Sequence, residues 1–253
     1  MNDLDRPDDP WASLRALTAA RIGLARSGAS LATRPLLEFR LAHARARDAV
    51  HEPLDEAKLI ADLETLGLPV LSVASAAKDR TQYLMRPDLG RTLADDAATM
   101  LGSYAGDADV AFVVTDGLSA RAVQAHATPL LAAALPALMK EHFLIAPIAF
   151  ARMGRVALGD AIAQALRASI VVMLIGERPG LSSPDSMGAY LTWQPTRETT
   201  DAERNCISNI RPDGIGYDDA AFKLVHMLRA MRAQRLSGVR LKDESDRLMI
   251  GEK

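Results

Sequence analysis

The sequence has little of several features, and each shortage excludes a class of protein. A single cysteine, Cys206, excludes an internal disulfide and fits a reducing compartment. Lysine and arginine number 30 against 32 acidic residues, so the chain lacks the basic excess that nucleic-acid binding requires. No apolar run approaches the roughly 20 residues needed to cross a bilayer. The acidic start, MNDLDRPDDP, is neither a secretory signal nor a transit peptide. We therefore expect a soluble cytoplasmic protein with no nucleic-acid or membrane partner.

Common cofactor and metal motifs are also missing. Gly154 and Gly159 have the spacing of a phosphate loop, but the next residue is Asp160 instead of lysine, and a carboxylate there would repel phosphate. No G-x-G-x-x-G follows a predicted strand, so a nicotinamide enzyme loses most of its support. The five histidines are scattered, with no H-E-x-x-H motif and no cluster with cysteine, so we predict no dedicated metal site. They are His43, His51, His126, His142 and His226.

The first quarter of the chain has a helical pattern. We predict a disordered lead-in over residues 1–10 and an N-terminal helical region, an appendage, over residues 11–67. Within it, apolar residues spaced three and four apart predict helices over 11–26, 36–50 and 55–66. The whole chain of 253 residues is long enough to bury roughly three quarters of its unfolded surface, so a substantial core is available.

From residue 68 onward, short β-branched runs alternate with alanine-rich helical segments. Apolar runs without a two-residue period are typical of strands covered on both faces. We therefore predict that residues 68–253 form an α/β domain with a doubly wound, mostly parallel, Rossmann-like sheet. The expected strands are 69–73, 109–114, 144–148, 169–175 and 190–193, and the expected helices are 91–101, 119–141, 159–167 and 217–235.

Two turns with polar residues follow predicted strands. Asp116 and Gly117 come after one strand, and Glu177 and Arg178 come directly after another. The carboxyl ends of parallel strands meet at one edge of a sheet, where ligands of such folds bind, so we expect both turns on the same rim. A plain turn at Asp116 and a solvated surface pair at Glu177 and Arg178 are the alternative interpretations.

A third polar segment, RNCISNIRPDG (204–214), contains the single cysteine. Such a density of amide, hydroxyl and guanidinium groups is costly to bury without hydrogen-bond partners. The segment is either a surface loop or one wall of a polar ligand pocket. Cys206 itself is either a nucleophile served by a distant base or a small apolar side chain.

Eight blocks of the sequence match one known family. They are TAARIGLARSG (18–28), LAHARARDAV (41–50), YLMRPDLGRTL (83–93), TDGLSARAV (115–123), GRVALGDAI (154–162), IGERPGLSSPDSMGAYLT (175–192), RNCISNIRPDG (204–214) and LSGVRLKD (236–243). Together they resemble the small (light) subunit of adenosylcobalamin-dependent ethanolamine ammonia-lyase. The resemblance covers about residues 18–243, and the GERPGL and CISNI blocks are its most specific part.

The resemblance implies one subunit of a heteromeric lyase that converts ethanolamine to acetaldehyde and ammonia by a radical rearrangement. In the family, the large subunit forms a barrel for the substrate, and the small subunit closes over adenosylcobalamin at the interface. The family's cofactor contacts fall on Val156, Glu177 and Cys206, with Cys206 acting through packing or a backbone contact. No catalytic residue is implied in this chain, and the isolated subunit is expected to have no turnover. A higher-order hetero-oligomer is implied.

Three features bear on how closely the family pattern is followed. Ala25 stands where the family has glycine. The D-x-H-x-x-G signature of many cobalamin-binding domains is absent, so the cofactor is expected to keep its own dimethylbenzimidazole ligand on cobalt. The segment before Trp11 is short, whereas family members in bacterial microcompartments can carry a longer leader, so the open cytoplasm is expected and a microcompartment is the alternative.

The residues alone leave two other classes of function open. One is a self-contained α/β enzyme, such as a hydrolase using Cys206 or a serine. The other is an interaction module in which the basic helix over residues 36–50 binds a partner without contacting a cofactor.

Overall fold

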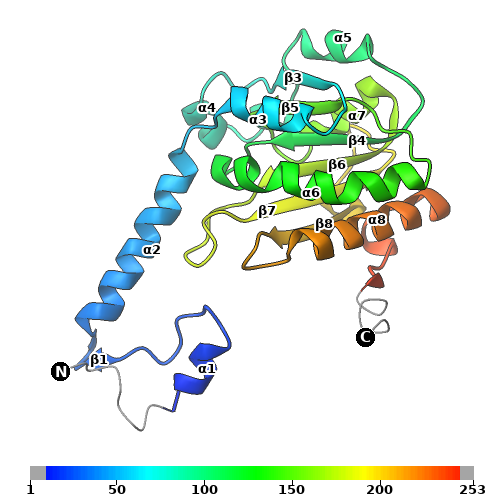
Figure 1. Ribbon diagram of the computed structural model, residues 1–253. Helices are drawn as coiled ribbons and strands as arrows, with labels where there is room; N and C mark the ends of the chain where they lie inside the picture. Colours follow the sequence, from blue (N-terminus) through cyan, green and yellow to red (C-terminus); the bar gives the residue numbers. More distant parts are fainter. Residues whose placement is uncertain (1–9, 246–253) are drawn as a thin grey trace.

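A six-stranded sheet forms the centre of the protein in the computed structural model, which describes residues 10–245 (Figure 1). The strand order is β3-β5-β4-β6-β7-β8. Strands β3, β5, β4 and β6 are mutually parallel, whereas β7 is antiparallel to both β6 and β8. The mixed α/β class and the mostly parallel sheet are therefore confirmed. The strands are β3 (Val70–Ala74), β4 (Ala108–Thr115), β5 (Ile148–Arg152), β6 (Ala168–Gly176), β7 (Met187–Trp193) and β8 (Arg204–Ile210).

Helices cover both faces of this sheet. Side chains alternate along β4, so that Phe112 contributes to one apolar cluster and Val113 to the other. The larger cluster joins the sheet to α3 (Glu56–Glu64), α6 (Ala120–Lys140) and α8 (Tyr217–Gln234). The smaller cluster joins it to α5 (Ala97–Gly102) and α7 (Leu158–Leu166). Strands buried on both sides explain why the sequence shows continuous apolar runs.

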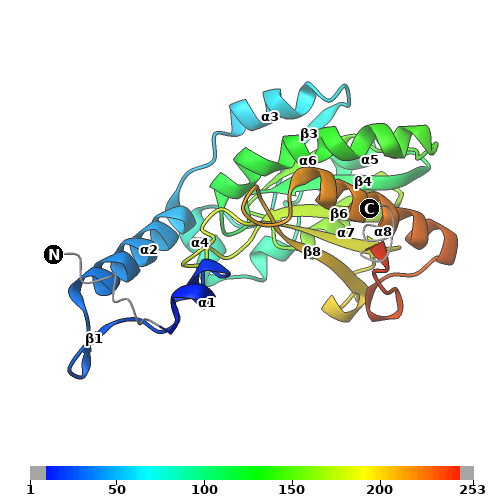
Figure 2. The same ribbon diagram turned by 60° about the horizontal axis from the view of Figure 1, so that its bottom comes forward.

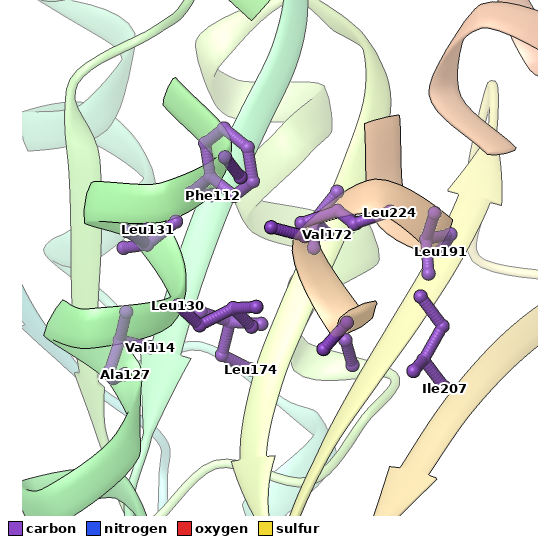
Figure 3. Packing of buried hydrophobic residues seen from close by; sticks show 14 of the residues in the cluster. Phe112, Val114, Ala127, Leu130, Leu131, Val172, Leu174, Leu191, Ile207 and Leu224 are labelled. Carbon is purple, nitrogen blue, oxygen red and sulfur yellow. The ribbon is translucent and has the colours of Figure 1, made fainter. Parts of the chain in front are cut away.

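The larger cluster is closely packed around β4, β6 and α6. Figure 3 shows Leu130 next to Leu174, and Phe112 farther along the same layer near Leu131. All four are fully buried. Removing a large apolar side chain from such a site costs about 3–5 kcal/mol because the cavity collapses only partly. This face of the sheet holds more of the buried apolar side chains than the other face.

Helix α6 has the length and apolar composition of a membrane span, the one such helix among the described residues. This differs from the expectation that no apolar segment comes close to that length. Half of its most apolar window is buried inside the protein, and ten of its residues, Leu130 and Leu131 among them, are buried. Its composition therefore reflects its position as a core helix.

The part of the N-terminal region up to the end of α2 projects away from the sheet in both views (Figures 1 and 2). The predicted helix over 11–26 is wrong in length, because α1 covers only Ala12–Ala16. The rest of the segment forms a short hairpin of two strands, β1 (Arg26–Ser27) and β2 (Ser30–Leu31). Gly23 before the hairpin and Gly28 in its turn have positive φ angles, which do not continue a helix. Helix α2 (Thr33–His51) confirms the helix predicted over 36–50.

Helix α3 confirms the predicted third helix, and it packs on the sheet through Leu59 and Leu63, which are fully buried in the larger cluster. Helix α2 buries only Pro35, Ala46 and Ala49. The end of α2 contacts α6, whereas α3 is the first helix that contributes to the larger cluster.

Four other points of the prediction need correction. The strand expected over 144–148 is observed as β5, which starts only at Ile148. Pro147 has no N–H to donate to a neighbouring strand, and Leu144 is exposed and so lies outside the buried sheet. The helix expected over 91–101 is divided into a short 3₁₀ turn, Leu89–Arg91, and α5. An additional helix, α4 (Arg80–Met85), had not been predicted. Strand β8 had been interpreted as a loop or pocket wall because its polar residues hide the strand pattern.

Candidate functional site

The turns after β4, β5 and β6 meet at one edge of the sheet. The Leu118 N–H donates to the Gly176 carbonyl at 2.9 Å, joining the turn after β4 to the end of β6. The Met153 N–H donates to Asp116 Oδ1 at 2.6 Å, joining the turn after β5 to the same place. The prediction that the Asp116 and Glu177 turns share a rim is therefore confirmed.

Glycines permit this contact between the two turns. Gly117 has φ +55°, a conformation that residues with a side chain rarely adopt. A Cβ atom added there would lie 2.4 Å from the Gly176 carbonyl oxygen. A Cβ at Gly176 would lie 2.1 Å from the Ser119 carbonyl oxygen. Both turns consequently need glycine at the point of contact.

Asp116 holds the rim together and is more than a plain turn residue. Its side chain is buried, and it accepts hydrogen bonds from the Met153 N–H and from Arg80 Nη1, the latter at 3.0 Å. Burial raises the pKa of the Asp116 carboxyl, while the Arg80 guanidinium lowers it. Arg80 also donates to the Gly117 carbonyl at 2.7 Å and to the Val50 carbonyl, with 3.0 Å from Nε and 2.7 Å from Nη2. It therefore connects the rim to the end of α2.

Tyr83 forms the inner wall beside this network. Its hydroxyl donates to the Gly154 carbonyl at 3.0 Å. The guanidinium carbons of Arg80 and Arg155 lie 5.0 and 4.2 Å from its ring centroid, within the range of cation–π interaction. Burial raises the pKa of Tyr83 to about 12, so the phenol stays protonated at neutral pH.

A cavity of about 420 Å³ opens at the rim, and two of the three predicted site residues line it. Val156 and Glu177 face this cavity together, although they are far apart in the sequence. Most other lining groups are apolar or aromatic, with a few polar ones. The complete lining is Tyr83, Leu118, Arg155, Val156, Ile175, Gly176, Glu177, Arg178, Tyr190 and Ser208.

The Glu177 carboxylate is held through one of its two oxygens. Oε2 accepts a short hydrogen bond from Ser186 Oγ and a second from the Asn209 N–H at 3.3 Å. The Glu177 N–H in turn donates to the Ser186 carbonyl at 2.9 Å. A Cβ at Gly188 would lie 2.8 Å from Oε1, so this glycine leaves room for the second oxygen. Oε1 has no hydrogen-bond donor among the described residues.

Cys206, the third predicted residue, lies next to the cavity and does not line it. It is paired with Tyr190 across β7 and β8, and Tyr190 does line the cavity. The residue is solvent-exposed, yet the surrounding protein still desolvates its thiol and raises the pKa to about 11. The Glu177 carboxylate acts in the same direction. A thiol with this pKa is almost fully protonated at neutral pH, so a nucleophilic thiolate is not available.

A polar cluster fixes the loop between β6 and β7. Arg211 Nη1 donates to Asp185 Oδ1 at 3.2 Å, and Ser119 Oγ donates to the Pro184 carbonyl at 3.0 Å. The buried His126 hydrogen-bonds to the Tyr217 hydroxyl at 2.8 Å through Nδ1. Burial lowers the pKa of His126, and the nearby Asp185 opposes that shift. The loop that starts with Glu177 is therefore held from two sides, by the segment after β8 and by the N-terminal part of α6.

A larger groove, about 1120 Å³, adjoins the cavity along α7. Next to its floor, Asp160 and Arg204 form a buried ion pair with two hydrogen bonds of 2.7 Å. Burial tends to lower the pKa of Arg204, but its hydrogen bonds to Asp160 more than offset this and raise the pKa. Asp160, which excluded a phosphate loop in the sequence, therefore has a structural partner from β8.

Comparison with known proteins gives the family. The sequence profile of "Ethanolamine ammonia-lyase light chain (EutC)" matches residues 8–242. A protein of Ralstonia nicotianae named ethanolamine ammonia-lyase small subunit is 52% identical over 242 residues, which cover 94% of this chain and 90% of the relative. Proteins with the same name from Azotobacter vinelandii and Xanthomonas campestris pv. campestris are 53% and 52% identical. Those matches cover 94% and 97% of this chain, and 90% and 92% of the relatives.

The fold and the rim define a mixed α/β protein with a cavity at the carboxyl ends of its parallel strands. The chain belongs to the ethanolamine ammonia-lyase light chain family, as the resemblance indicated.

Sequence reasoning missed several residues of the cavity and its support, namely Tyr83, Arg155, Ser186 and Tyr190. All lie inside the quoted family blocks. Nothing in their local pattern distinguishes them, because their role depends on contacts between separate strands.

Proposed function

We propose that this chain is the small subunit of an ethanolamine ammonia-lyase and forms one wall of the adenosylcobalamin site, facing a large catalytic subunit. The complex converts ethanolamine to acetaldehyde and ammonia. The observation that carries the proposal is identity of about half the residues over nearly the whole chain with proteins named as that subunit. This chain contributes binding and positioning, and it has no turnover alone.

The cavity at the rim fits one side of a corrinoid. A corrin ring has a broad apolar face and a periphery of amide side chains, and the cavity combines Val156, Ile175 and Tyr190 with the carboxylate of Glu177. A volume of about 420 Å³ is too small to enclose a corrinoid, which supports a second wall from another subunit. When bound, the cofactor supplies an organic radical by homolysis of its carbon–cobalt bond.

Glu177 would accept a hydrogen bond from a peripheral amide of the corrinoid. Its Oε2 is already occupied by Ser186 and Asn209, whereas Oε1 has no donor. A carboxylate fixed in this way is pre-organised, because little side-chain freedom remains to be lost on binding. Ser186 is thus a positioning residue for Glu177. Cys206 would contribute by contact next to Tyr190, since its raised pKa is unsuited to nucleophilic chemistry.

The test uses the complex formed by co-expression with the large subunit. We expect Glu177→Ala and Ser186→Ala each to weaken binding of cyanocobalamin, measured by equilibrium dialysis and corrinoid absorbance. Ser186→Thr, which keeps the hydroxyl, should retain more affinity than Ser186→Ala. Arg240→Gln, an exposed change outside both cavities, is the matched control. A wild-type complex that binds no corrinoid, or a large subunit fully active without this chain, would refute the proposal.

We also infer three broader properties. The sheet is doubly wound and Rossmann-like, supported by α6 and α7 covering opposite faces between successive parallel strands. The functional domain covers residues 68–253 and the appendage residues 11–67, which limited proteolysis would test.

The complex forms a higher-order hetero-oligomer in the cytoplasm, with a bacterial microcompartment as the alternative. Cell fractionation and light scattering of the purified complex distinguish these.

A further inference from the structure

Helix α2 is attached to the rest of the protein near its C-terminal end, while its other end projects away from the sheet (Figure 1). Ala46 and Ala49, in its last two turns, are buried, and the helix contacts α6. Directly after the helix, Glu52 Oε2 accepts from Arg121 of α6, at 2.9 Å from Nε and 2.8 Å from Nη2. A helix with so few buried side chains opens locally at a lower cost than a core helix.

Arg80 binds the backbone at this end of α2. It donates to the Val50 carbonyl from both Nε and Nη2, at 3.0 and 2.7 Å. Val50 is the next-to-last residue of the helix, and the last four carbonyls of a helix have no partner within it. The guanidinium charge also lies at the negative end of the helix dipole, where a cation is stabilising. Arg80 therefore caps α2 from outside the helix.

The same guanidinium binds the rim. Its Nη1 donates to Asp116 Oδ2 at 3.0 Å and to the Gly117 carbonyl at 2.7 Å. Gly117 contacts Gly176, the residue before Glu177, so closely that neither has room for a side chain. With the two bonds to α2, Arg80 makes four hydrogen bonds to three oxygens in separate places. The planar fork of an arginine can do this, whereas a lysine ammonium cannot reproduce it.

Arg80 also reaches the wall of the cavity through Tyr83. The two residues are three positions apart on α4 and so lie on the same side of the helix. The Arg80 guanidinium carbon is 5.0 Å from the centroid of the Tyr83 ring, and Tyr83 lines the cavity at the rim. Within residues 10–245, the lining of this cavity comes from segments other than α2. Any effect of α2 on the cavity must therefore pass through intermediate side chains, and Arg80 contacts both sides.

We propose that Arg80 is a positioning residue for the cavity at the rim and couples it to the attachment of α2. The proposal rests on the proposed function, because the ligand of the cavity is taken to be the corrinoid. The two states are an α2 whose end is bonded to Arg80 and an α2 whose end is released. A ligand that favours the ordered rim favours the bonded state, and by reciprocity the bonded state raises the affinity for the ligand.

The experiment measures amide hydrogen exchange in the complex with the large subunit, with and without saturating cyanocobalamin. We expect the corrinoid to slow exchange in the last two turns of α2 by about fivefold or more, a usual size for coupling between sites. In Arg80→Gln this slowing should disappear, and the affinity for cyanocobalamin, measured by equilibrium dialysis, should fall by a similar factor. Arg80→Lys keeps the charge without the fork, so it should restore only part of both effects.

Glu52→Gln is the matched control, because it removes the ion pair with Arg121 at the same end of α2 without changing a contact of the rim. Exchange in α2 should become faster in this variant, yet cyanocobalamin should still slow it by the wild-type factor. If Arg80→Gln does not assemble, Arg80→Lys carries the same comparison.

Two outcomes would overturn the coupling. One is a wild-type complex in which α2 exchanges at the same rate with and without cyanocobalamin, and the other is wild-type slowing in the Arg80 variants. A complex that binds cyanocobalamin and shows either result leaves the proposed function intact and removes only the role of Arg80. A wild-type complex that binds no corrinoid removes both.

Discussion

The two faces of the sheet differ in what their side chains contribute. The face under α6 and α8 is closed by a continuous apolar cluster that includes Phe112 and Leu224. The face under α7 carries the buried Asp160–Arg204 ion pair and adjoins the rim cavity and the groove. One face is closed by apolar side chains, and the other combines a smaller apolar cluster with a groove and a cavity that polar side chains help to line. Substitutions on the two faces should therefore separate folding from binding.

The largest expected effect is on the apolar face. Phe112→Ala removes a fully buried ring and leaves a cavity between β4 and α6. The free energy of unfolding should fall by about 3–5 kcal/mol, measured by urea denaturation. A loss below about 1 kcal/mol would mean that this face is less closely packed than described.

A somewhat smaller effect is expected for the ion pair on the opposite face. Asp160→Asn leaves Arg204 buried without its main counter-charge, which typically costs about 3–5 kcal/mol. We expect the lower end, because Asp201 still lies 3.5 Å from Arg204. The double variant Asp160→Leu with Arg204→Met should recover most of this loss. If the single and double variants are equally unstable, charge burial is not the cause.

A smaller, pH-dependent effect is expected at His126, where the apolar face meets the rim. Burial lowers its pKa in the folded state below the ordinary value of 6.5, so the unfolded chain takes up the proton first. Stability should therefore fall as the pH drops below about 6.5. His126→Asn should show a flatter dependence between pH 7.5 and pH 5, monitored by thermal unfolding. An unchanged profile would exclude His126 as a source of acid sensitivity.

The smallest effect on stability is expected at an exposed residue of the groove along α7. Arg197→Gln changes an exposed groove residue with no partner among the described side chains, so the unfolding free energy should stay within about 0.5 kcal/mol. Urea denaturation of this variant beside Phe112→Ala gives a direct contrast between the two faces. A large loss at Arg197 would show that the groove contributes to folding.

The fold class and most of the sheet could be predicted from the sequence because the buried strands have uninterrupted apolar runs. Strands β4 and β6 lie close to where the pattern placed them. The pattern failed at β8, because the polar composition of this strand hides the alternation of a strand. It also failed at the first helix, since an exposed segment with Gly23 and Gly28 has no core to stabilise it.

The site was only partly predictable. Placing Asp116 and Glu177 on one rim needed only the rule that parallel strands end at the same edge. Val156 and Glu177 were obtained from the family resemblance, and the structure brings them to one cavity. The anchoring of Glu177 by Ser186 depends on backbone geometry across the β6–β7 loop, which spacing alone does not reveal.

The contact between Gly117 and Gly176 makes the rim a single unit for protein engineering. Because each backbone occupies the space that a side chain on the other turn would need, neither turn tolerates replacement by itself. Grafting a loop of different specificity onto this scaffold requires both turns to be exchanged together, as a matched pair from one donor protein.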